Sequence, residues 1–427
     1  MTDKDISRHL TPVLAESLTT SRVVNLIGPR QVGKTTLVRD LYGKGSYLTL
    51  DDAGVLAAVE ADPSGQLTSL MADVKDGPLI IDEAQRSTEL ALAIKAIVDK
   101  DRKKGQFLIT GSSNVFANMK VADSLAGRMV TEKLWPLTAA EIKHAQPNQL
   151  LDWALNKSPS LKRIMPPEEL TRDDYITLIL QGGFPEPREL AERQRQTLYR
   201  NYINSIVDRD VADLLRVRKT DKLRLLIDQM AARTGQEINV SELSGVVGIK
   251  RETVDTYLDV LERLSLLLKL GAWTSGESRR EVKQPKYHFV DTGMNCALRR
   301  FKANSFDANS ANASQLGGLL ESYIFNELLR ALPHLDNEFR LYHWRSADHR
   351  EIDIIADAGA HVVGIEVKSA ATVSTDDFKH LKWFAAQGPG RTRGFTGIVF
   401  YLGTRKLSFG DNCFAIPVSG LWSDIRT

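Results

Sequence analysis

GPRQVGKTT, running from Gly28 to Thr36, is the stretch that decides the fold of this chain, because it fills the phosphate-loop pattern G-x-x-x-x-G-K-[ST]. The apolar run VVNLI at 23–27 comes directly before it and is typical of a buried parallel strand. After it, apolar residues recur at helical spacing over 37–41, which predicts that the loop opens a helix. Strand, glycine-rich loop and helix in this order predict a site for a nucleoside triphosphate, ATP above all.

The residue types of the loop suit the binding of phosphates. Its two glycines let the backbone bend and approach the phosphates, and the N–H groups at the helix start point toward the anion. We expect Lys34 to reach the β and γ phosphates and the Thr35 hydroxyl to bind Mg²⁺. The residues predicted to contact the nucleotide are Gly28, Pro29, Arg30, Gln31, Val32, Gly33, Lys34, Thr35 and Thr36.

A second apolar strand, PLII at 78–81, ends in Asp82 and Glu83. An acidic residue at the carboxyl end of a parallel strand can hold Mg²⁺ through its water shell, and the next Glu can orient and deprotonate the attacking water. An ordinary strand that enters a loop would show the same pattern. Its place about fifty residues after a phosphate loop favours Asp82 as a metal-side residue and Glu83 as the catalytic base.

Two further places in the sequence are candidates for contacts with the γ-phosphate. The predicted strand at 106–110 runs into the small polar residues Ser112, Ser113 and Asn114, any of which could be a sensor or part of a solvated turn. Arg128 is a candidate arginine finger, a residue that a neighbouring subunit often supplies, and the alternative is a surface arginine in a salt bridge. A finger acting between subunits would require a homo-oligomer.

The composition is that of a globular protein with several domains. A length of 427 residues suggests about three domains, and 42% of the residues are hydrophobic. The net charge of +2 means that any nucleic-acid binding must come from local patches. Cys296 and Cys413 are the only cysteines, which excludes a disulfide framework and fits a reducing cytosol. Because no apolar run approaches the length of a signal peptide or membrane span, we expect a cytoplasmic protein without a membrane partner.

The middle of the chain is expected to be helical and then to form a winged helix. Residues 239–249 predict a capped helix with a glycine turn, and residues 250–264 predict a second helix with one apolar face, which is a helix-turn-helix pattern. Segments 266–273 and 285–290 are predicted strands. The loop that joins these strands is basic, with Arg279, Arg280, Lys283 and Lys286.

The charges of this region support two interpretations. The second helix of the pair exposes Glu252, Asp255 and Asp259, and acids that face phosphates are unfavourable. The basic loop favours contact with DNA. The unit therefore either contacts DNA or has a protein-contact or domain-coupling role.

The C-terminal part contains a pattern found in nucleases. EIDII at 351–355 and IEVK at 365–368 are predicted to form a hairpin that brings Asp353 beside Glu366. Residues two apart in a strand share a face, so Glu366 and Lys368 point together. The two carboxylates would bind Mg²⁺ and the lysine would orient the attacking water, which is the D…(D/E)-x-K arrangement of restriction-type nucleases.

Neighbouring elements extend this pattern. The predicted helix at 318–324 offers Glu321 as a further metal-side acid, and a helix near 375–385 and a strand at 394–401 complete an α-β-β-β-α-β order. A strand with Glu and Lys on its wet face is ordinary, and many such cores serve only as binding or scaffold modules. Cleavage and simple binding are therefore separate hypotheses.

Taken together, the sequence resembles a prokaryotic family of ATPases with an N-terminal AAA-type domain (AAA_14) and a C-terminal domain of restriction-endonuclease-like fold (the DUF4143 group). The resemblance implies that the ATPase and nuclease-like motifs carry the functions described above, with Arg128 at the position of a candidate finger. Its motifs are GPRQVGKTTL at 28–37, LIIDEAQ at 79–85, LITGSSN at 108–114, SLAGR at 124–128, WPLTAAEI at 135–142, GGFPEP at 182–187, DRDV at 208–211, the stretch 239–270, VDTG at 290–293, GGLLE at 317–321, EIDII at 351–355 and IEVK at 365–368.

The sequence therefore predicts an α/β protein in four parts. These are a P-loop AAA-type parallel-sheet domain at 1–145, a helical lid or linker at 146–230, a winged helix at 231–300 and a PD-(D/E)XK-like, restriction-endonuclease-like α/β core at 301–427. The first hypothesis for its function is an ATP-hydrolysing enzyme that acts on or binds DNA. The alternative is a nucleotide-controlled switch whose C-terminal domain binds a protein partner, in a defence or toxin–antitoxin role, without nuclease activity.

Overall fold

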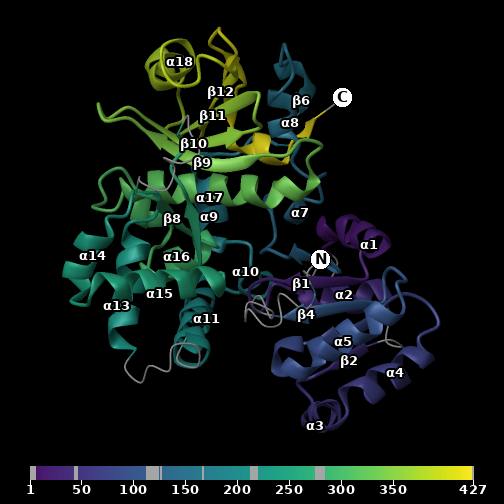
Figure 1. The fold of residues 1–427 in the computed structure, drawn as a ribbon. Coiled ribbons are helices and arrows are strands. Elements are labelled where there is room, and N and C mark those ends of the chain that lie inside the picture. The colour runs from purple at the N-terminus through teal and green to yellow at the C-terminus, as the bar shows by residue number, and fades with distance from the viewer. Residues whose placement is uncertain are drawn as a thin grey trace. The chain divides into compact units, whose positions relative to one another are not determined.

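The computed structural model describes residues 6–42, 47–111, 125, 127–165, 168–211, 220–274 and 284–425. The chain divides into two compact units (Figure 1). The smaller unit, which we call the nucleotide unit, holds Ser7–Leu137 with Arg263–Ser265, and the larger unit, which we call the C-terminal unit, holds Met1–Ile6, Thr138–Glu262 and Leu266–Thr427. Within the described residues, no helix has the length and apolar character needed to cross a membrane.

The nucleotide unit is built on a five-stranded parallel sheet in the order β2-β3-β4-β1-β5. Its strands are β1 (Val23–Ile27), β2 (Tyr47–Thr49), β3 (Leu79–Asp82), β4 (Phe107–Gly111) and β5 (Met129–Lys133). Because all five strands run the same way, their carboxyl ends meet at one edge, where the phosphate loop and Asp82 lie. The predicted parallel α/β sheet is confirmed.

Helices cover this sheet, as its apolar strands require. They are α1 (Leu10–Thr20), α2 (Lys34–Tyr42), α3 (Ala53–Ala61), α4 (Pro63–Asp73) and α5 (Thr88–Lys100). Every residue of β3 and β4 is buried, which is the pattern of a parallel strand packed on both faces. Side-chain caps start three of the helices: Asp52 accepts hydrogen bonds from the first turn of α3, Asp62 accepts one from the first turn of α4, and Ser87 accepts one from the first turn of α5.

A six-stranded mixed sheet in the order β13-β14-β12-β11-β10-β9 dominates the C-terminal unit. The strands β9 to β11 form an antiparallel meander, and β12 and β14 then add parallel to β11. Helix α17 precedes the meander and α18 lies between β11 and β12 in sequence, so the helix-strand-strand-strand-helix-strand order expected from the sequence is present. The bounds are α17 (Gln315–Ala331), β9 (Arg340–Arg345), β10 (Glu351–Asp357), β11 (His361–Lys368), α18 (Lys379–Ala386), β12 (Gly394–Tyr401), β13 (Leu407–Ser408) and β14 (Cys413–Pro417).

The rest of this unit is mostly helical. Gly248 ends α14 in the left-handed conformation (φ 72°), and the chain turns there into α15, which β7 and β8 follow as an antiparallel pair. The elements are α7 (Ala139–Ile142), α8 (Leu150–Ala154), α9 (Arg172–Gln181), α10 (Pro185–Arg188), α11 (Glu192–Ser205), α13 (Asp221–Ala232), α14 (Val240–Val247), α15 (Arg251–Arg263), α16 (Thr292–Leu298), and the short strands β6 (Ile164–Met165), β7 (Leu267–Leu270), β8 (Lys286–Phe289) and β15 (Asp424–Ile425).

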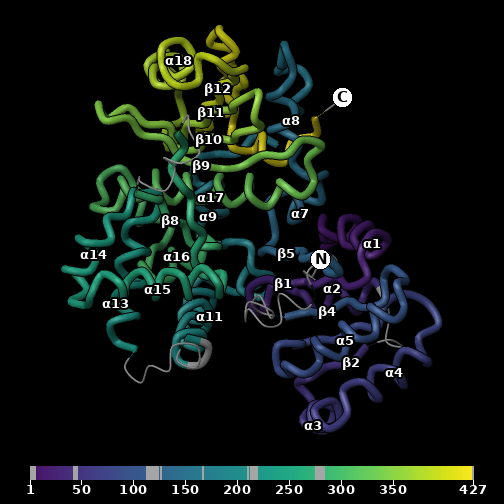
Figure 2. The backbone as a smooth tube through the Cα atoms, viewed as in Figure 1, coloured from purple at the N-terminus to yellow at the C-terminus, as the bar shows by residue number. Residues whose placement is uncertain are grey.

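Residues far apart in the sequence share one apolar core in this unit. The ring of Trp153 on α8 packs edge-on against Phe414 on β14, with 5.3 Å between the ring centroids. The Thr396 hydroxyl of β12 donates a 2.7 Å hydrogen bond to the carbonyl of Ala154, which holds α8 beside the C-terminal strands (Figure 2). One compact unit thus contains what the sequence analysis divides into a helical linker, a winged helix and a C-terminal core.

Candidate functional site

The phosphate loop packs tightly against the end of β5. Gly28 has a φ of 153°, and a Cβ at this position would lie 2.1 Å from the carbonyl oxygen of Leu134. Only glycine fits there, because both the backbone angle and the contact exclude a side chain. Further along the loop, Gln31 and Gly33 also have positive φ angles, 63° and 94°. The loop is therefore a sharply turned backbone that leads into α2, as the sequence predicts.

Lys34 begins α2 and is buried, with 6% of its surface exposed. Its ammonium donates hydrogen bonds to the carbonyl oxygens of Gly28 (3.0 Å) and Pro29 (2.9 Å) within the loop. Burial lowers the pKa of Lys34 to about 8. The cation thus lies inside the loop, close to the backbone that would surround a phosphate.

Asp82 is the centre of a hydrogen-bond network at the end of β3. Its Oδ2 accepts hydrogen bonds from the hydroxyls of Thr35 and Tyr47, each at 2.7 Å, and its Oδ1 accepts one from the Thr110 hydroxyl. Although burial favours the neutral acid, these three donors lower the pKa of Asp82 below its ordinary value. Asp82 is therefore an ionised carboxylate that contacts the hydroxyl expected to bind Mg²⁺. A carboxylate and a hydroxyl oxygen in contact suit this hard cation.

Tyr47 and Thr110 were not identified from the sequence. Tyr47 opens β2, and Thr110 lies one residue before the end of β4. Both reach Asp82 because β2 and β4 flank β3 in the sheet. Thr110 lies two residues before Ser112, the first of the predicted sensor residues, and this proximity was the one local signal for Thr110.

Glu83 follows Asp82 in a left-handed backbone conformation, with φ 56° and ψ 38°. Its backbone N–H donates a 3.1 Å hydrogen bond to Asp82 Oδ1, and its carboxylate accepts a hydrogen bond from the Gln85 side chain. A non-glycine residue in this region is strained, and such strain clusters at functional sites. Because of this left-handed conformation, the chain leaves the direction of β3 at Glu83.

Arg8 is a residue of this unit that the sequence analysis missed. Its guanidinium donates to the carbonyl of Val32 in the phosphate loop (2.8 Å) and to the carbonyl of Trp135 beyond β5 (2.6 Å). It therefore joins the loop to the segment that leaves the sheet. A single arginine just before the first helix gives no local signal of this role, because its two acceptors are backbone atoms distant in sequence.

The other γ-phosphate candidates have different outcomes. Ser112, Ser113 and Asn114 lie outside the described residues. Arg128 forms an ion pair with Asp99, with 3.1 Å between Nη2 and Oδ2. Its carbonyl accepts a hydrogen bond from the backbone N–H of Val23 at the start of β1, so it lies at the edge of the sheet opposite the phosphate loop. Arg128 does not face the loop of its own chain.

The structure brings the nuclease-like residues of the C-terminal unit together. In the antiparallel pair β10–β11, Ile354 faces Ile365, which places Asp353 opposite Glu366 as predicted. Asp353 Oδ2 accepts a 2.9 Å hydrogen bond from the Val367 N–H, and the Lys368 ammonium lies 2.9 Å from Glu366 Oε2. The hairpin argument from the sequence thus describes the local geometry correctly.

Lys286 changes the character of this cluster. The sequence analysis placed it in a basic loop, but it is the first residue of β8 and is buried, with 5% of its surface exposed. Its ammonium lies 2.8 Å from Glu321 Oε1 and 3.8 Å from Asp353 Oδ1. Burial opposes the charge, yet these carboxylates raise the pKa of Lys286 above its ordinary value. A protonated lysine therefore lies among the acids that were expected to hold a metal.

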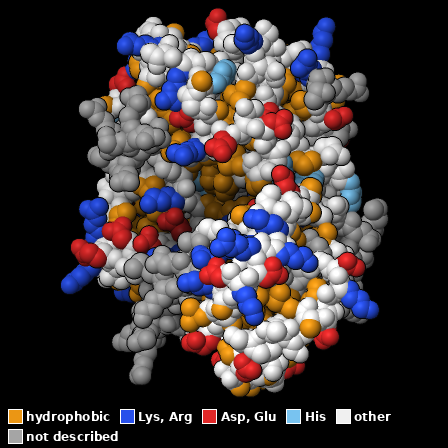
Figure 3. Space-filling view, turned by 45° about the vertical axis from the view of Figure 1, so that its right-hand side comes forward, with side chains coloured by type: hydrophobic (Ala, Val, Ile, Leu, Met, Phe, Trp, Pro, Cys, Tyr) orange, Lys and Arg blue, Asp and Glu red, His pale blue; other side chains and the backbone are white. Residues whose placement is uncertain are grey.

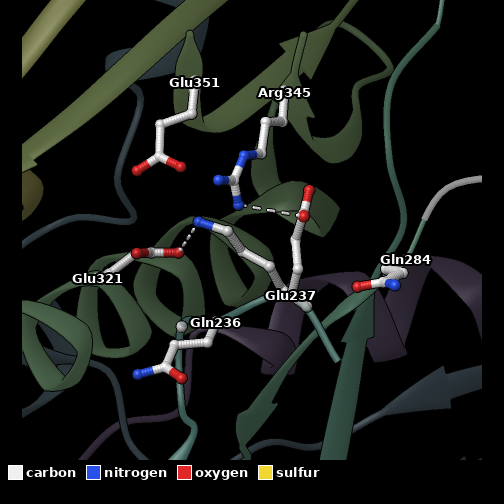
Figure 4. A pocket seen from close by; sticks show the side chains of 8 residues that line it. Gln236, Glu237, Gln284, Glu321, Arg345 and Glu351 are labelled. Carbon is white, nitrogen blue, oxygen red and sulfur yellow. Dashed lines mark hydrogen bonds and ion pairs between the residues drawn. The ribbon is translucent and has the colours of Figure 1, made fainter. Parts of the chain in front are cut away.

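The cluster opens into a pocket of about 350 Å³. Glu351 and Arg345 enter it from the sheet and Glu321 from α17, and Arg345 Nη1 lies 3.3 Å from Glu237 Oε2 (Figure 4). Its lining residues are Gly235, Gln236, Glu237, Gln284, Lys286, Glu321, Arg345 and Glu351. Glu351, like Lys286, was not identified from the sequence as a site residue.

The cluster does not fit the predicted magnesium site of Glu321, Asp353 and Glu366. Among the residues that the structure describes, no group of three or more His, Cys, Asp or Glu side chains is arranged to hold a metal ion. Instead, the carboxylates are bound by two ammonium groups and one backbone N–H. Burial raises the pKa of Glu321 and that of Glu366, and the ammonium groups of Lys286 and Lys368 oppose this shift.

Three sequence families match successive parts of the chain. An AAA domain family matches residues 20–143, a domain of unknown function (DUF8612) matches 172–305, and another domain of unknown function (DUF4143) matches 316–421. The chain therefore has an AAA-type domain around its phosphate loop and a C-terminal DUF4143 domain, in agreement with the resemblance found in the sequence. The AAA-type domain supports ATP binding.

Similar proteins were found among both sequences and structures. The chain is 27% identical to an uncharacterized protein of Mycobacterium tuberculosis, over 84% of this chain and 73% of that protein. It is 28% identical to an uncharacterized protein of Haemophilus influenzae, over 64% of this chain and 62% of that protein. A STAND signal transduction ATPase of Pyrococcus horikoshii matches 78% of this chain with 13% identity and a TM-score of 0.28. This chain spans 48% of that structure, and a likeness so low supports no argument about function.

Proposed function

We propose that this chain is an ATPase that binds ATP with Mg²⁺ at the phosphate loop and hydrolyses it. The observation that carries the proposal is the contact between Thr35 and the ionised Asp82, next to the buried ammonium of Lys34. A hydroxyl, a carboxylate and a lysine in this arrangement are the groups that phosphoryl transfer in a P-loop enzyme needs.

Each of these residues has a separate task in the proposed reaction. The loop N–H groups and Lys34 bind the phosphates, and Thr35 and Asp82 would hold Mg²⁺, directly or through water. Bound Mg²⁺ supplies positive charge that stabilises the charge building up on the phosphate oxygens. Glu83 orients the attacking water and accepts its proton as the new O–P bond forms and the bond between the β and γ phosphates breaks.

Two substitutions test the proposal. Lys34→Ala should abolish ATP binding, because the loop loses its cation. Glu83→Gln should keep ATP binding but lower kcat by about 100-fold or more, because the amide cannot accept the proton. Binding is measured with a fluorescent ATP analogue and turnover by phosphate release. Lys100→Ala, at the exposed end of α5, is the matched control and should change neither. Full activity in the Glu83→Gln protein would contradict the proposed base.

Action on DNA is the first candidate for what hydrolysis serves. The pair α14–α15 with its glycine turn has the element order of a helix-turn-helix, followed by the two strands that a winged helix requires. If this interpretation is correct, one form of DNA, whether single-stranded, duplex or branched, should raise the ATPase rate, with Lys34→Ala as the blank. Metal-dependent cleavage is not part of the proposal, because the carboxylate cluster does not fit a magnesium site.

A nucleotide-controlled switch that binds a protein partner is the second candidate, and charge favours it. Glu252, Asp255 and Asp259 are exposed on α15, and Arg251 of the same helix lies 3.8 Å from Asp255. Lys286 is buried and therefore cannot contribute to a basic loop. On the face shown in Figure 3, acidic and basic side chains are interspersed rather than separated by sign. Two results together would support the switch. The ATPase rate should not change with any form of DNA, and a protein partner should co-purify with the Glu83→Gln variant only when ATP is bound.

A further inference from the structure

The Lys286 ammonium lies beside two of the three acids that were expected to hold a divalent cation. Its Nζ contacts Glu321 from α17 and lies near Asp353 from β10, at 2.8 and 3.8 Å. We propose that the ammonium group of Lys286 takes the position of a metal cation in this cluster. As long as β8 remains paired as it is here, the C-terminal unit therefore binds no divalent metal ion at this cluster. This inference does not rest on the proposed ATPase activity, which concerns the other unit.

The backbone holds Lys286 in this position from two sides. In the antiparallel pair β7–β8, Lys286 faces Leu270. On its other side it forms a β-bridge with Glu237, and the N–H of Ile238 donates a 2.9 Å hydrogen bond to the carbonyl of Pro285. Lys286 is therefore part of a paired strand, unlike a long side chain on an exposed loop. The pairing of β8 therefore fixes the backbone position from which the Lys286 side chain reaches the cluster.

Four of the six carboxylate oxygens of Glu321, Asp353 and Glu366 already have other partners. Glu321 Oε1 and Asp353 Oδ1 face the Lys286 ammonium, Asp353 Oδ2 accepts the N–H of Val367, and Glu366 Oε2 binds Lys368. Glu366 Oε1 is buried and has no hydrogen-bond partner among the residues that the structure describes. A magnesium ion requires six oxygen ligands at about 2.1 Å, and in this cluster it would meet an ammonium group first. The two oxygens left over, Glu366 Oε1 and Glu321 Oε2, are too few for such a site.

Charge balance explains why a lysine can replace an ion here. Carboxylates buried without a counter-charge are strongly destabilising, and either a metal or an ammonium can supply that charge. The ammonium of Lys286 is covalently attached, so it offsets part of the charge of these carboxylates at any metal concentration. The neighbouring pocket lined by Glu351 and Arg345 then remains available for a ligand without metal coordination.

Manganese binding to the nucleotide-free full chain tests the proposal, measured by electron paramagnetic resonance of free Mn²⁺. We expect the wild-type cluster to bind no Mn²⁺. Lys286→Met keeps much of the side-chain length but removes the charge, and it should create one Mn²⁺ site with at least ten-fold higher affinity than any site in the wild type. Adding Glu321→Gln to Lys286→Met should remove that site again. Every protein is also measured with Asp82→Asn, so that binding near the phosphate loop is subtracted.

Two controls keep the result decisive. Lys286→Arg retains the cation and should behave as the wild type. If Lys286→Met does not fold, which circular dichroism would show, the wild-type titration decides alone. Mn²⁺ binding to the wild type that Asp353→Asn or Glu321→Gln abolishes would overturn the proposal, as would a folded Lys286→Met protein that gains no site. The proposal is supported if the wild type shows no Mn²⁺ binding that either Asp353→Asn or Glu321→Gln removes.

Discussion

The Thr35 hydroxyl donates a 2.7 Å hydrogen bond to Asp82 Oδ2, which joins the first turn of α2 to the carboxyl end of β3. The two residues are 47 positions apart, and they meet because β1 and β3 lie in the same parallel sheet, separated only by β4. Thr110 at the end of β4 completes the contact by donating to the other oxygen of Asp82. The candidate ATPase site is therefore a product of the sheet order as much as of its motifs.

Gly28→Ala should abolish nucleotide binding, because the new methyl group would lie 2.1 Å from the carbonyl oxygen of Leu134 and force the phosphate loop away from β5. Equilibrium binding of a fluorescent ATP analogue measures the effect. Gly245→Ala in helix α14 is the matched control, since a Cβ at that position would have no atom of the described residues within 4 Å. That control should leave binding unchanged. Normal ATP affinity in Gly28→Ala would show that the loop does not need this close approach.

ATP affinity should fall as the pH rises through about 8, the pKa to which burial lowers Lys34. Above that pH the free loop holds a neutral amine, so binding the anion must also take up a proton. The dissociation constant measured by titration calorimetry from pH 6.5 to 9.5 should be constant at first and then increase. Lys133 also has a pKa lowered to about 8 by burial, so Lys133→Met serves as the control and should keep the same midpoint. Affinity that is independent of pH would contradict this role for Lys34.

The lowered pKa of Lys34 also makes the free energy of unfolding depend on pH. Between pH 8 and the ordinary lysine pKa of 10.5, the unfolded chain binds a proton at Lys34 that the folded chain does not. Stability therefore rises with pH across this window as far as Lys34 is concerned. Lys34→Met should remove this slope from the free energy of unfolding, which urea denaturation at several pH values would show. An unchanged slope would mean that other groups cause it.

Arg8→Ala should weaken both the nucleotide unit and its ATP binding, because the carbonyls of Val32 and Trp135 lose their shared donor. The loss of two hydrogen bonds to a charged group is expected to lower the free energy of unfolding by about 3–6 kcal/mol. Urea denaturation measures this change, and ATP affinity should fall with it. Arg102→Ala, at an exposed position after α5, is the control and should change stability little. An Arg8→Ala protein as stable as the wild type would exclude the joining role.

Arg128 can act as an arginine finger only on the nucleotide of another copy of the chain, because it lies at the edge of the sheet opposite its own phosphate loop. If it does so, mixing Arg128→Ala with Glu83→Gln should restore part of the ATPase activity that each variant lacks alone. Asp99→Asn breaks the ion pair but keeps the arginine, and it should retain activity. If Arg128 is only the partner of Asp99 in a surface salt bridge, Arg128→Ala will be fully active and the mixture will show no gain.

Much of the fold could be predicted because its signals are local. The apolar runs of β1, β3 and β4 are short and are fully or nearly fully buried, and β3 and β4 carry polar residues at or next to their carboxyl ends. The pairing of β10 with β11 also followed from alternation alone, and it placed Asp353 opposite Glu366. The division of the C-terminal unit could not be predicted in this way, because its core joins α8 to β14 through contacts such as Trp153 with Phe414.

The sequence by itself determined the phosphate loop and the strands of the parallel sheet, and it predicted the tasks of Lys34, Thr35, Asp82 and Glu83, because these signals depend on backbone angles and on strand and helix periods within a few residues. Only the tertiary structure decided that Lys286 is a buried cation among carboxylates, that Arg8 supports the loop, and that Arg128 faces away from it. The reason is physical. Burial and charge pairing depend on which distant elements meet, and a lysine or arginine in the sequence looks the same whether water or a carboxylate surrounds it.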